Sequence, residues 1–183
     1  MNLINTPILG LLVAESKSAQ DHRGSFSRFF CEAALHESLH SKHITQINHS
    51  HTTALGSVRG LHFQHPPHAE IKFVRCLKGR VWDVVVDLRK GSRTFLKWFS
   101  QELSPENSLM MIIPEGCGHG FQSLEPNCEM LYLHTASYSP EHESGLRPND
   151  PMLNISWPLP ITTLTDRDRN HPLINGGFRG IEL

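Results

Sequence analysis

Apolar and polar side chains alternate with a period of two along most of this 183-residue chain. In V-W-D-V-V-V-D-L-R, residues 81–89, one face is apolar and the other carries Asp83, Val85 and Asp87. Successive side chains of a β-strand point to opposite faces, so the pattern predicts strands rather than helices. Similar patterns and short apolar runs predict further strands at 8–14, 45–50, 73–77, 95–100, 108–113 and 129–138.

Turn-forming residues separate these segments, as in Lys78-Gly79, Lys90-Gly91-Ser92 and Glu125-Pro126-Asn127. Good helix formers predict one short helix at 31–39, and the tail after Asn149 has room for another. Many short strands with little helix are typical of a sandwich or barrel. We therefore predict an all-β jelly-roll barrel with a few short helices, forming a single domain over 1–183.

Composition narrows the possible functions. The formal net charge of −1 gives no reason to expect nucleic acid or an anionic membrane as a partner. The apolar run 8–14 is too short to cross a bilayer, and no Lys or Arg precedes it, so we expect neither a membrane span nor a signal peptide. Four cysteines without a C-x-x-C pair favour the reducing cytoplasm, and Cys117 is expected to be a buried, unreactive thiol.

One stretch, R-G-L-H-F-Q-H-P-P-H-A-E-I-K at 59–72, concentrates titratable side chains within the β framework. Alternation places His62 on one face and the apolar Leu61 and Phe63 on the other. The two prolines interrupt the ladder, because proline cannot donate a backbone hydrogen bond. The next strand presents Lys72, so His62 and Lys72 are predicted to line one cavity across adjacent strands.

Three further residues are candidates for the same cavity. The glycine-rich turn P-E-G-C-G-H-G-F at 114–121 delivers His119 at its end. Tyr132 lies on one face of its strand, and Asp168 belongs to T-D-R-D-R at 165–169. A histidine suits general-base catalysis near neutral pH, a lysine stabilises an oxyanion, and a tyrosine donates a proton.

A metal site is the competing interpretation of His62. Metal-binding cupins place H-x-H on one strand and a second histidine after P-x-G-x-x-H. The second half is present here as P-E-G-C-G-H, but the first half reads His62-Phe63-Gln64. We therefore expect no bound metal and no cofactor.

Taken together, these segments resemble the dTDP-4-dehydrorhamnose 3,5-epimerase family of nucleotide-sugar synthesis, from about residue 21 to residue 172. The resemblance rests on D-H-R-G-S-F, Q-I-N-H-S-H, G-S-V-R-G-L-H-F-Q-H-P-P-H-A-E-I-K, W-D-V-V-V-D-L-R, P-E-G-C-G-H-G-F, L-Y-L-H-T-A-S-Y, N-D-P, W-P and T-D-R-D, in this order. It implies a cupin-type jelly roll, a homodimer and an epimerase, hence an isomerase, that needs no metal.

The resemblance also implies roles for individual residues. His62 is the base beside the C4 ketone, supported by Asp168, while Lys72 stabilises the enolate oxygen and Tyr132 returns a proton from the other face. The remaining implied residues bind the substrate: Asp83 and His119 at the sugar, Arg59, Gln46 and Asn48 at the diphosphate and nucleotide, Tyr138 by stacking, and Arg23 and Phe26 at the nucleotide in the partner subunit's site.

Several positions depart from the expected pattern. Arg59 and His62 have opposite parity in a regular strand, and a bulge at Gly60 would resolve this. Arg28 stands where the family pattern D-x-R-G-x-F-x-E has glutamate, in the segment near the nucleotide base. Leu133 replaces a lysine at a position with core parity, and Glu70 replaces a glutamine where it can pair with Lys72.

These observations predict an epimerase that inverts C3 and C5 of a dTDP-4-keto-6-deoxyhexose in rhamnose-type deoxysugar biosynthesis. An epimerase of one centre, or one acting on a CDP-linked sugar, is the first alternative, and Arg28 motivates it. A metal-dependent cupin oxygenase and a non-enzymatic sugar-nucleotide-binding cupin are the others.

Overall fold

Thirteen strands and two short helices make up the computed structural model, which describes residues 1–183. In chain order these elements are β1 (Asn2–Asn5), β2 (Leu12–Glu15), β3 (Ser18–Asp21), β4 (Gly24–Ser27), α1 (Glu32–Leu39), β5 (Gln46–Thr52), β6 (Val58–Gln64), β7 (Lys72–Lys78), β8 (Val81–Asp87), β9 (Trp98–Leu103), β10 (Leu109–Ile113), β11 (Cys117–Ser123), β12 (Cys128–His134), β13 (Glu143–Gly145) and α2 (Asp166–Asn170).

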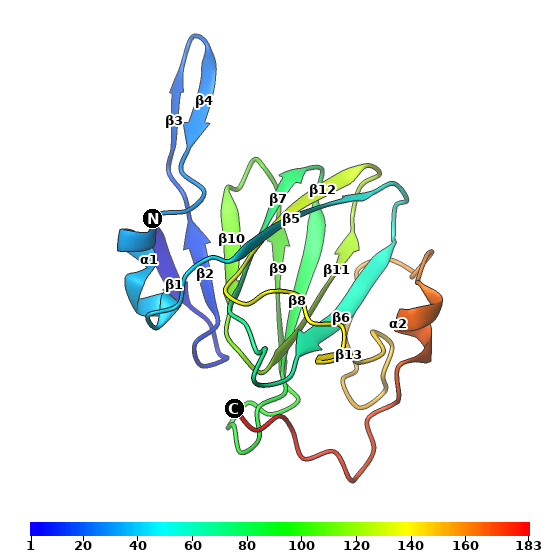
Figure 1. The fold of residues 1–183 in the computed structure, drawn as a ribbon. Coiled ribbons are helices and arrows are strands. Elements are labelled where there is room, and N and C mark those ends of the chain that lie inside the picture. The colour runs from blue at the N-terminus through cyan, green and yellow to red at the C-terminus, as the bar shows by residue number, and fades with distance from the viewer.

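The strands form two antiparallel sheets and one separate hairpin (Figure 1). The six-stranded sheet has the order β1-β2-β10-β7-β12-β5, and the five-stranded sheet has the order β13-β6-β11-β8-β9. Hairpin β3–β4 projects away from both sheets (Figure 1). The crossovers between the sheets agree with the predicted all-β jelly-roll architecture.

The main core lies between the two sheets and draws on both. Val74 and Met111 from one sheet pack with Val85 and Phe121 from the other. Two outer clusters cover the opposite faces: α1 packs on the six-stranded sheet, and the C-terminal tail packs on the five-stranded sheet. Burial of both faces explains why β8 places Val84 outward and Val85 inward, as its alternation predicts.

Predicted elements differ from the structure at four places. The turn expected at 114–121 is mostly strand, because β11 covers Cys117–Ser123 and places His119 within it. The strand expected at 8–14 begins only at Leu12, because Ile8 is buried in a turn instead. The strand expected at 95–100 is shifted to Trp98–Leu103, and the one expected at 129–138 ends at His134. Ile8 packs in the main core and Leu96 packs against an outer cluster, so hydrophobicity placed these two segments in strands. The predicted helix is confirmed as α1, Glu32–Leu39.

A bulge in β6 sets the geometry of the site. His62 pairs with His119 of β11, but Arg59 pairs with Phe121, so β6 uses one more residue than β11 over this interval. The extra residue places Arg59 and His62 on the same side of the strand. Gly60 has φ +123°, and a Cβ there would lie 2.6 Å from the Cα of Gly120, so the bulge requires glycine.

Candidate active site

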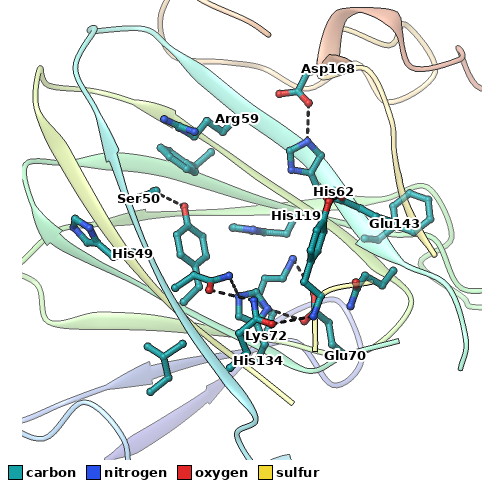
Figure 2. Close-up of a pocket in the computed structure, with 18 of the residues that line it drawn as sticks. His49, Ser50, Arg59, His62, Glu70, Lys72, His119, His134, Glu143 and Asp168 are labelled. Atoms are coloured by element: carbon teal, nitrogen blue, oxygen red, sulfur yellow. Dashed lines mark hydrogen bonds and ion pairs between the residues drawn. The ribbon is translucent and has the colours of Figure 1, made fainter. Parts of the chain in front are cut away.

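A pocket of about 710 Å³ opens at one end of the barrel, between β5, β6, β7, β11, β12 and α2 (Figure 2). It brings together residues that are up to 122 positions apart in the sequence. Of the twelve residues predicted from the sequence, nine line it: Gln46, Asn48, Arg59, His62, Lys72, His119, Tyr132, Tyr138 and Asp168.

His62 and Asp168 form a close pair on one wall. His62 Nε2 lies 2.6 Å from Asp168 Oδ1, and the aspartate side chain is only 3% exposed. Burial alone would raise the pKa of Asp168, but the hydrogen bond and charge of His62 outweigh it and hold that pKa below its usual value. Because an ionised carboxylate only accepts, Nε2 carries the hydrogen and Nδ1 of His62 keeps the lone pair.

The start of α2 positions Asp168. Thr165 is the N-cap residue, and its hydroxyl accepts a hydrogen bond of 3.1 Å from the Asp168 amide. An acidic residue at this position often bonds back to the N-cap amide. Here the Asp168 carboxylate turns instead toward His62 and the amide of Gly60, which lies 3.4 Å from Oδ2. The short helix therefore serves to direct one carboxylate at the imidazole.

A second histidine–aspartate pair lies beside the first. His119 Nε2 is 2.9 Å from Asp83 Oδ2, and both side chains are almost completely buried. Burial raises the pKa of Asp83 despite the nearby imidazole of His119. Asp83 does not line the pocket. Its contribution to the pocket is the hydrogen bond that holds the ring of His119 in place.

Tyr132 reaches the pocket from the opposite sheet. Its hydroxyl lies 2.9 Å from Ser50 Oγ, and its ring meets that of His119 edge to face with centroids 6.3 Å apart. Burial raises the pKa of Tyr132, so the phenol stays protonated at neutral pH and has a hydrogen to donate.

Lys72 pairs with Glu70, as the sequence predicted. Its Nζ lies 3.3 Å from Glu70 Oε1, and Glu70 Oε2 lies 2.6 Å from Nδ1 of His134 (Figure 2). Leu133, which replaces a lysine of the family pattern, is accommodated because it points to the outer face and packs in the cluster under α1.

Charged and aromatic side chains border the pocket beside α2. The Tyr138 hydroxyl donates to Glu143 Oε2 at 2.6 Å, and Arg167 Nη2 lies 2.6 Å from the same carboxylate. The Glu143 carboxylate raises the pKa of Tyr138, because it accepts the phenol hydrogen. Arg59 is exposed at the pocket and is held by Thr52 Oγ1 at 2.9 Å.

Besides Asp83, two predicted residues lie outside this pocket. Arg23 and Phe26 belong to the projecting hairpin β3–β4, where Phe26 is 75% exposed and Arg23 pairs only with Asp21. Neither side chain lines the pocket of its own chain.

His62, Asp168 and His171 are the residues best placed to hold a metal ion, since their ligand atoms lie within 4.8 Å of one another. His171 Nε2 is buried without a hydrogen-bond partner. Three ligands that include two imidazoles and one carboxylate are typical of some catalytic zinc sites. In this protein the same Nε2 and carboxylate already bond to each other at 2.6 Å, which suits a proton-transfer pair equally well.

Sequence reasoning missed several pocket residues. Glu143 begins the three-residue strand β13 and Arg167 lies in the five-residue helix α2, elements too short for periodicity to indicate direction. His134 was recognisable, because it shares a strand face with Tyr132 and lies two residues further on. Cys117, by contrast, is buried as expected, and burial raises its pKa to about 12.

Known proteins are similar to this chain over most of its length. The family model for dTDP-4-dehydrorhamnose 3,5-epimerase matches residues 5–176. The chain is 42% identical to the dTDP-4-dehydrorhamnose 3,5-epimerase of Shigella flexneri over 171 residues, covering 93% of this chain and 94% of that protein.

Solved structures show the same fold. A dTDP-6-deoxy-D-glucose-3,5-epimerase from Legionella pneumophila, in complex with dTDP-4-keto-L-rhamnose, is 38% identical, with a TM-score of 0.89 and coverage of 94% and 92% of the two chains. A 3'-monoepimerase from Streptomyces bikiniensis, in complex with dTDP-quinovose, is 31% identical, with a TM-score of 0.85 and coverage of 92% and 85%. The chain is therefore a member of the dTDP-4-dehydrorhamnose 3,5-epimerase family, and the resemblance in its sequence motifs is confirmed.

Proposed function

We propose that this protein inverts C3 and C5 of a dTDP-4-keto-6-deoxyhexose in deoxysugar biosynthesis. The C–H bonds at C3 and C5 are acidic because each carbanion delocalises into the C4 ketone. Removal of a proton on one face and return of a proton on the other inverts the carbon. The reaction therefore needs a base, an acid opposite the base and a cation near the ketone oxygen.

The single observation that carries the proposal is the pairing of His62 with Asp168 (Figure 2), in a pocket that Lys72 and Tyr132 also line. The C–H bond breaks, its proton moves to His62 Nδ1, and its electron pair forms the enolate. Asp168 stabilises the imidazolium, and the Lys72 ammonium stabilises the enolate oxygen. The Tyr132 phenol then gives its proton to the other face of the carbon.

The rest of the pocket suits the nucleotide. Three polar residues, Arg59, Gln46 and Asn48, line the same pocket. Arg59 binds the diphosphate, and the amides of Gln46 and Asn48 bind the nucleotide part. His119, oriented by Asp83, contacts the sugar, and Tyr138 stacks at the border of the pocket. The protein acts as a homodimer in which Arg23 and Phe26 of hairpin β3–β4 reach the partner's site. The projection and exposure of this hairpin support that arrangement (Figure 1).

We place the enzyme in the cytoplasm, and its four cysteines, all free thiols, support this placement. No helix of the structure has the length and apolar character needed to span a bilayer.

Epimerisation of a single centre is the second candidate function. One relative of this fold is a 3'-monoepimerase, and it is similar over 92% of this chain. A CDP-linked substrate is a variant of the same alternative, because Arg28 introduces a positive, exposed side chain just after β4.

Replacement of the base tests the proposal. His62→Ala should abolish solvent deuterium exchange at both carbons of dTDP-4-keto-6-deoxyglucose, while dTDP still binds. His65→Ala is the matched control, because His65 lies three residues further on and outside the pocket. Survival of exchange in His62→Ala would show that another residue is the base.

A further inference from the structure

Glu70 lies two residues before β7 and lines the pocket wall formed by β7, β12 and β5. Its two carboxylate oxygens have different partners: Oε1 lies 3.3 Å from Lys72 Nζ, and Oε2 lies 2.6 Å from His134 Nδ1. All three side chains are nearly buried, with exposed fractions of 9–12%. Burial raises the pKa of Glu70, but His134 and Lys72 outweigh it and hold that pKa below its ordinary value. Glu70 is therefore an ionised acceptor.

The hydrogen bonds continue beyond His134 to the amides that line the pocket. Nε2 of His134 lies 3.3 Å from Asn48 Nδ2, and Asn48 Oδ1 accepts a hydrogen bond of 3.1 Å from Gln46 Nε2. Gln46 Oε1 in turn accepts a hydrogen bond of 2.9 Å from the backbone amide of Tyr138. One row of polar contacts thus joins Lys72 to the segment that carries Tyr138.

Whether each group donates or accepts fixes the direction of the next hydrogen bond in the row. A carboxylate only accepts, so Nδ1 of His134 must donate to Glu70. The neutral imidazole then has its lone pair on Nε2, which accepts from the amide NH₂ of Asn48. The carbonyl oxygen of Asn48 consequently faces Gln46. Glu70 thereby sets the orientation of these two amides from one end of the row, and the Tyr138 amide, which donates to Gln46 Oε1, supports the same orientation from the other end.

We infer that Glu70 is a positioning residue that holds the Lys72 ammonium with one oxygen and, through the tautomer of His134, orients the Asn48 and Gln46 amides for the substrate. The assignment rests on the proposed function for what these amides bind. It adds a residue pair, Glu70 and His134, to the determinants of substrate binding in this protein.

Only a carboxylate accepts hydrogen bonds from both neighbours at once. A glutamine at position 70 has one accepting oxygen and one donating NH₂. With its oxygen toward the Lys72 ammonium, its NH₂ faces His134 and forces the ring into the opposite tautomer. Nε2–H of His134 then meets the NH₂ of Asn48, donor against donor, and the row of contacts breaks.

The same strands offer a matched control. Glu129 also contacts one lysine and one histidine, Lys78 at 3.6 Å and His49 at 3.2 Å. Its side chain is 31% exposed, and it does not line the pocket. Glu129→Gln therefore removes a similar Lys–Glu–His contact without touching the amides.

Long-range ¹H–¹⁵N NMR of histidine-labelled protein tests the tautomer without any turnover. We expect His134, identified by the signal lost in His134→Ala, to carry its hydrogen on Nδ1 in the wild type and in Glu129→Gln. In Glu70→Gln it should carry the hydrogen on Nε2. An unchanged tautomer in Glu70→Gln, with the protein folded, would overturn the inference.

Binding and turnover test the consequence for function. Glu70→Gln should weaken dTDP affinity about tenfold, the effect of one misdirected hydrogen bond, while kcat stays within about threefold because the glutamine oxygen still accepts from Lys72. Equal loss in Glu129→Gln, or unchanged dTDP affinity in Glu70→Gln, would contradict the positioning role. A wild type that binds dTDP and shows the expected tautomers, yet exchanges no protons of 4-keto sugars, would refute the proposed reaction and leave the role of Glu70 supported.

Discussion

Replacement of Asp168 by asparagine tests how the proposed base is activated. Asp168 Oδ2 accepts from the Gly60 amide, so an amide oxygen at position 168 would stay on that side. The new NH₂ would then face His62 Nε2 and donate to it. His62 would carry its hydrogen on Nδ1, the atom proposed to take the substrate proton, and the base would be blocked.

The magnitude follows from the geometry. Asp168 Oδ1 lies 2.6 Å from His62 Nε2 and the aspartate side chain is 3% exposed, so the carboxylate and the imidazolium charge centre interact at about 4 Å. At an effective dielectric constant of about 20, loss of this attraction costs about 4 kcal/mol in the charged intermediate, or about 1,000-fold in kcat. Affinity for dTDP should change much less, since neither residue is proposed to bind the nucleotide.

The assay is proton exchange in D₂O followed by NMR at C3 and C5 of the 4-keto sugar. Asp166→Asn is the matched control: it removes a carboxylate from the same helix, two residues earlier, where the side chain is 89% exposed and pairs only with Arg169. We expect wild-type exchange in Asp166→Asn. An Asp168→Asn enzyme that is folded and within tenfold of the wild type would refute the account of base activation.

Three further predictions concern the proton donor, the stability of the fold at low pH and the effect of metal removal. Tyr132→Phe should reduce product formation at least tenfold more than deuterium wash-in, because the first deprotonation does not need the phenol; equal losses would count against Tyr132 as the acid. Contacts with Arg89, Ser92 and Thr94 outweigh burial and lower the pKa of Asp87 to about 2, so its stabilisation is present above pH 3.8 and is lost as the pH falls toward 2. Asp87→Asn should cost about 2 kcal/mol of unfolding free energy at pH 7 and almost nothing at pH 2, as urea unfolding measures. Extensive dialysis against a chelator should leave epimerisation unchanged; loss of activity that returns with one equivalent of a transition metal would favour the site at His62, Asp168 and His171.

Alternation in the sequence was sufficient to predict most of the pocket walls. His62, Lys72 and Tyr132 lie on regular strands, where the parity of a residue decides which face it occupies. The same rule predicted that Glu70 could reach Lys72, because Glu70 lies two residues before Lys72, the first residue of β7, and shares its parity. It also predicted that Leu133 packs away from the pocket.

The positions of residues outside regular strands could be learned only from the structure. Arg59 reaches the pocket only because the bulge at Gly60 adds one residue to β6, and a bulge changes parity without changing composition. Glu143 and Arg167 come together from segments 24 residues apart that share no periodic pattern. For Asp168 the resemblance supplied the role, and the structure supplied the reason, an N-capped turn of helix that directs the carboxylate at His62.

Hairpin β3–β4 carries the residues that we propose to act in the partner subunit's site. Phe26 and Arg23 are exposed, as expected for residues that serve a partner, and Arg28 lies at the base of the same hairpin. Any preference for the nucleotide base is therefore proposed to reside in residues that the two subunits share.

The most direct test of the central claim is proton NMR of dTDP-4-keto-6-deoxyglucose in D₂O with the wild-type protein, beside the CDP-linked sugar. We predict deuterium at both C3 and C5 of the dTDP-linked sugar. Exchange at one carbon only, or only with the CDP-linked sugar, would contradict the double epimerisation and would make Arg28 the next residue to change. Absence of exchange with both sugars would contradict the proposed function altogether.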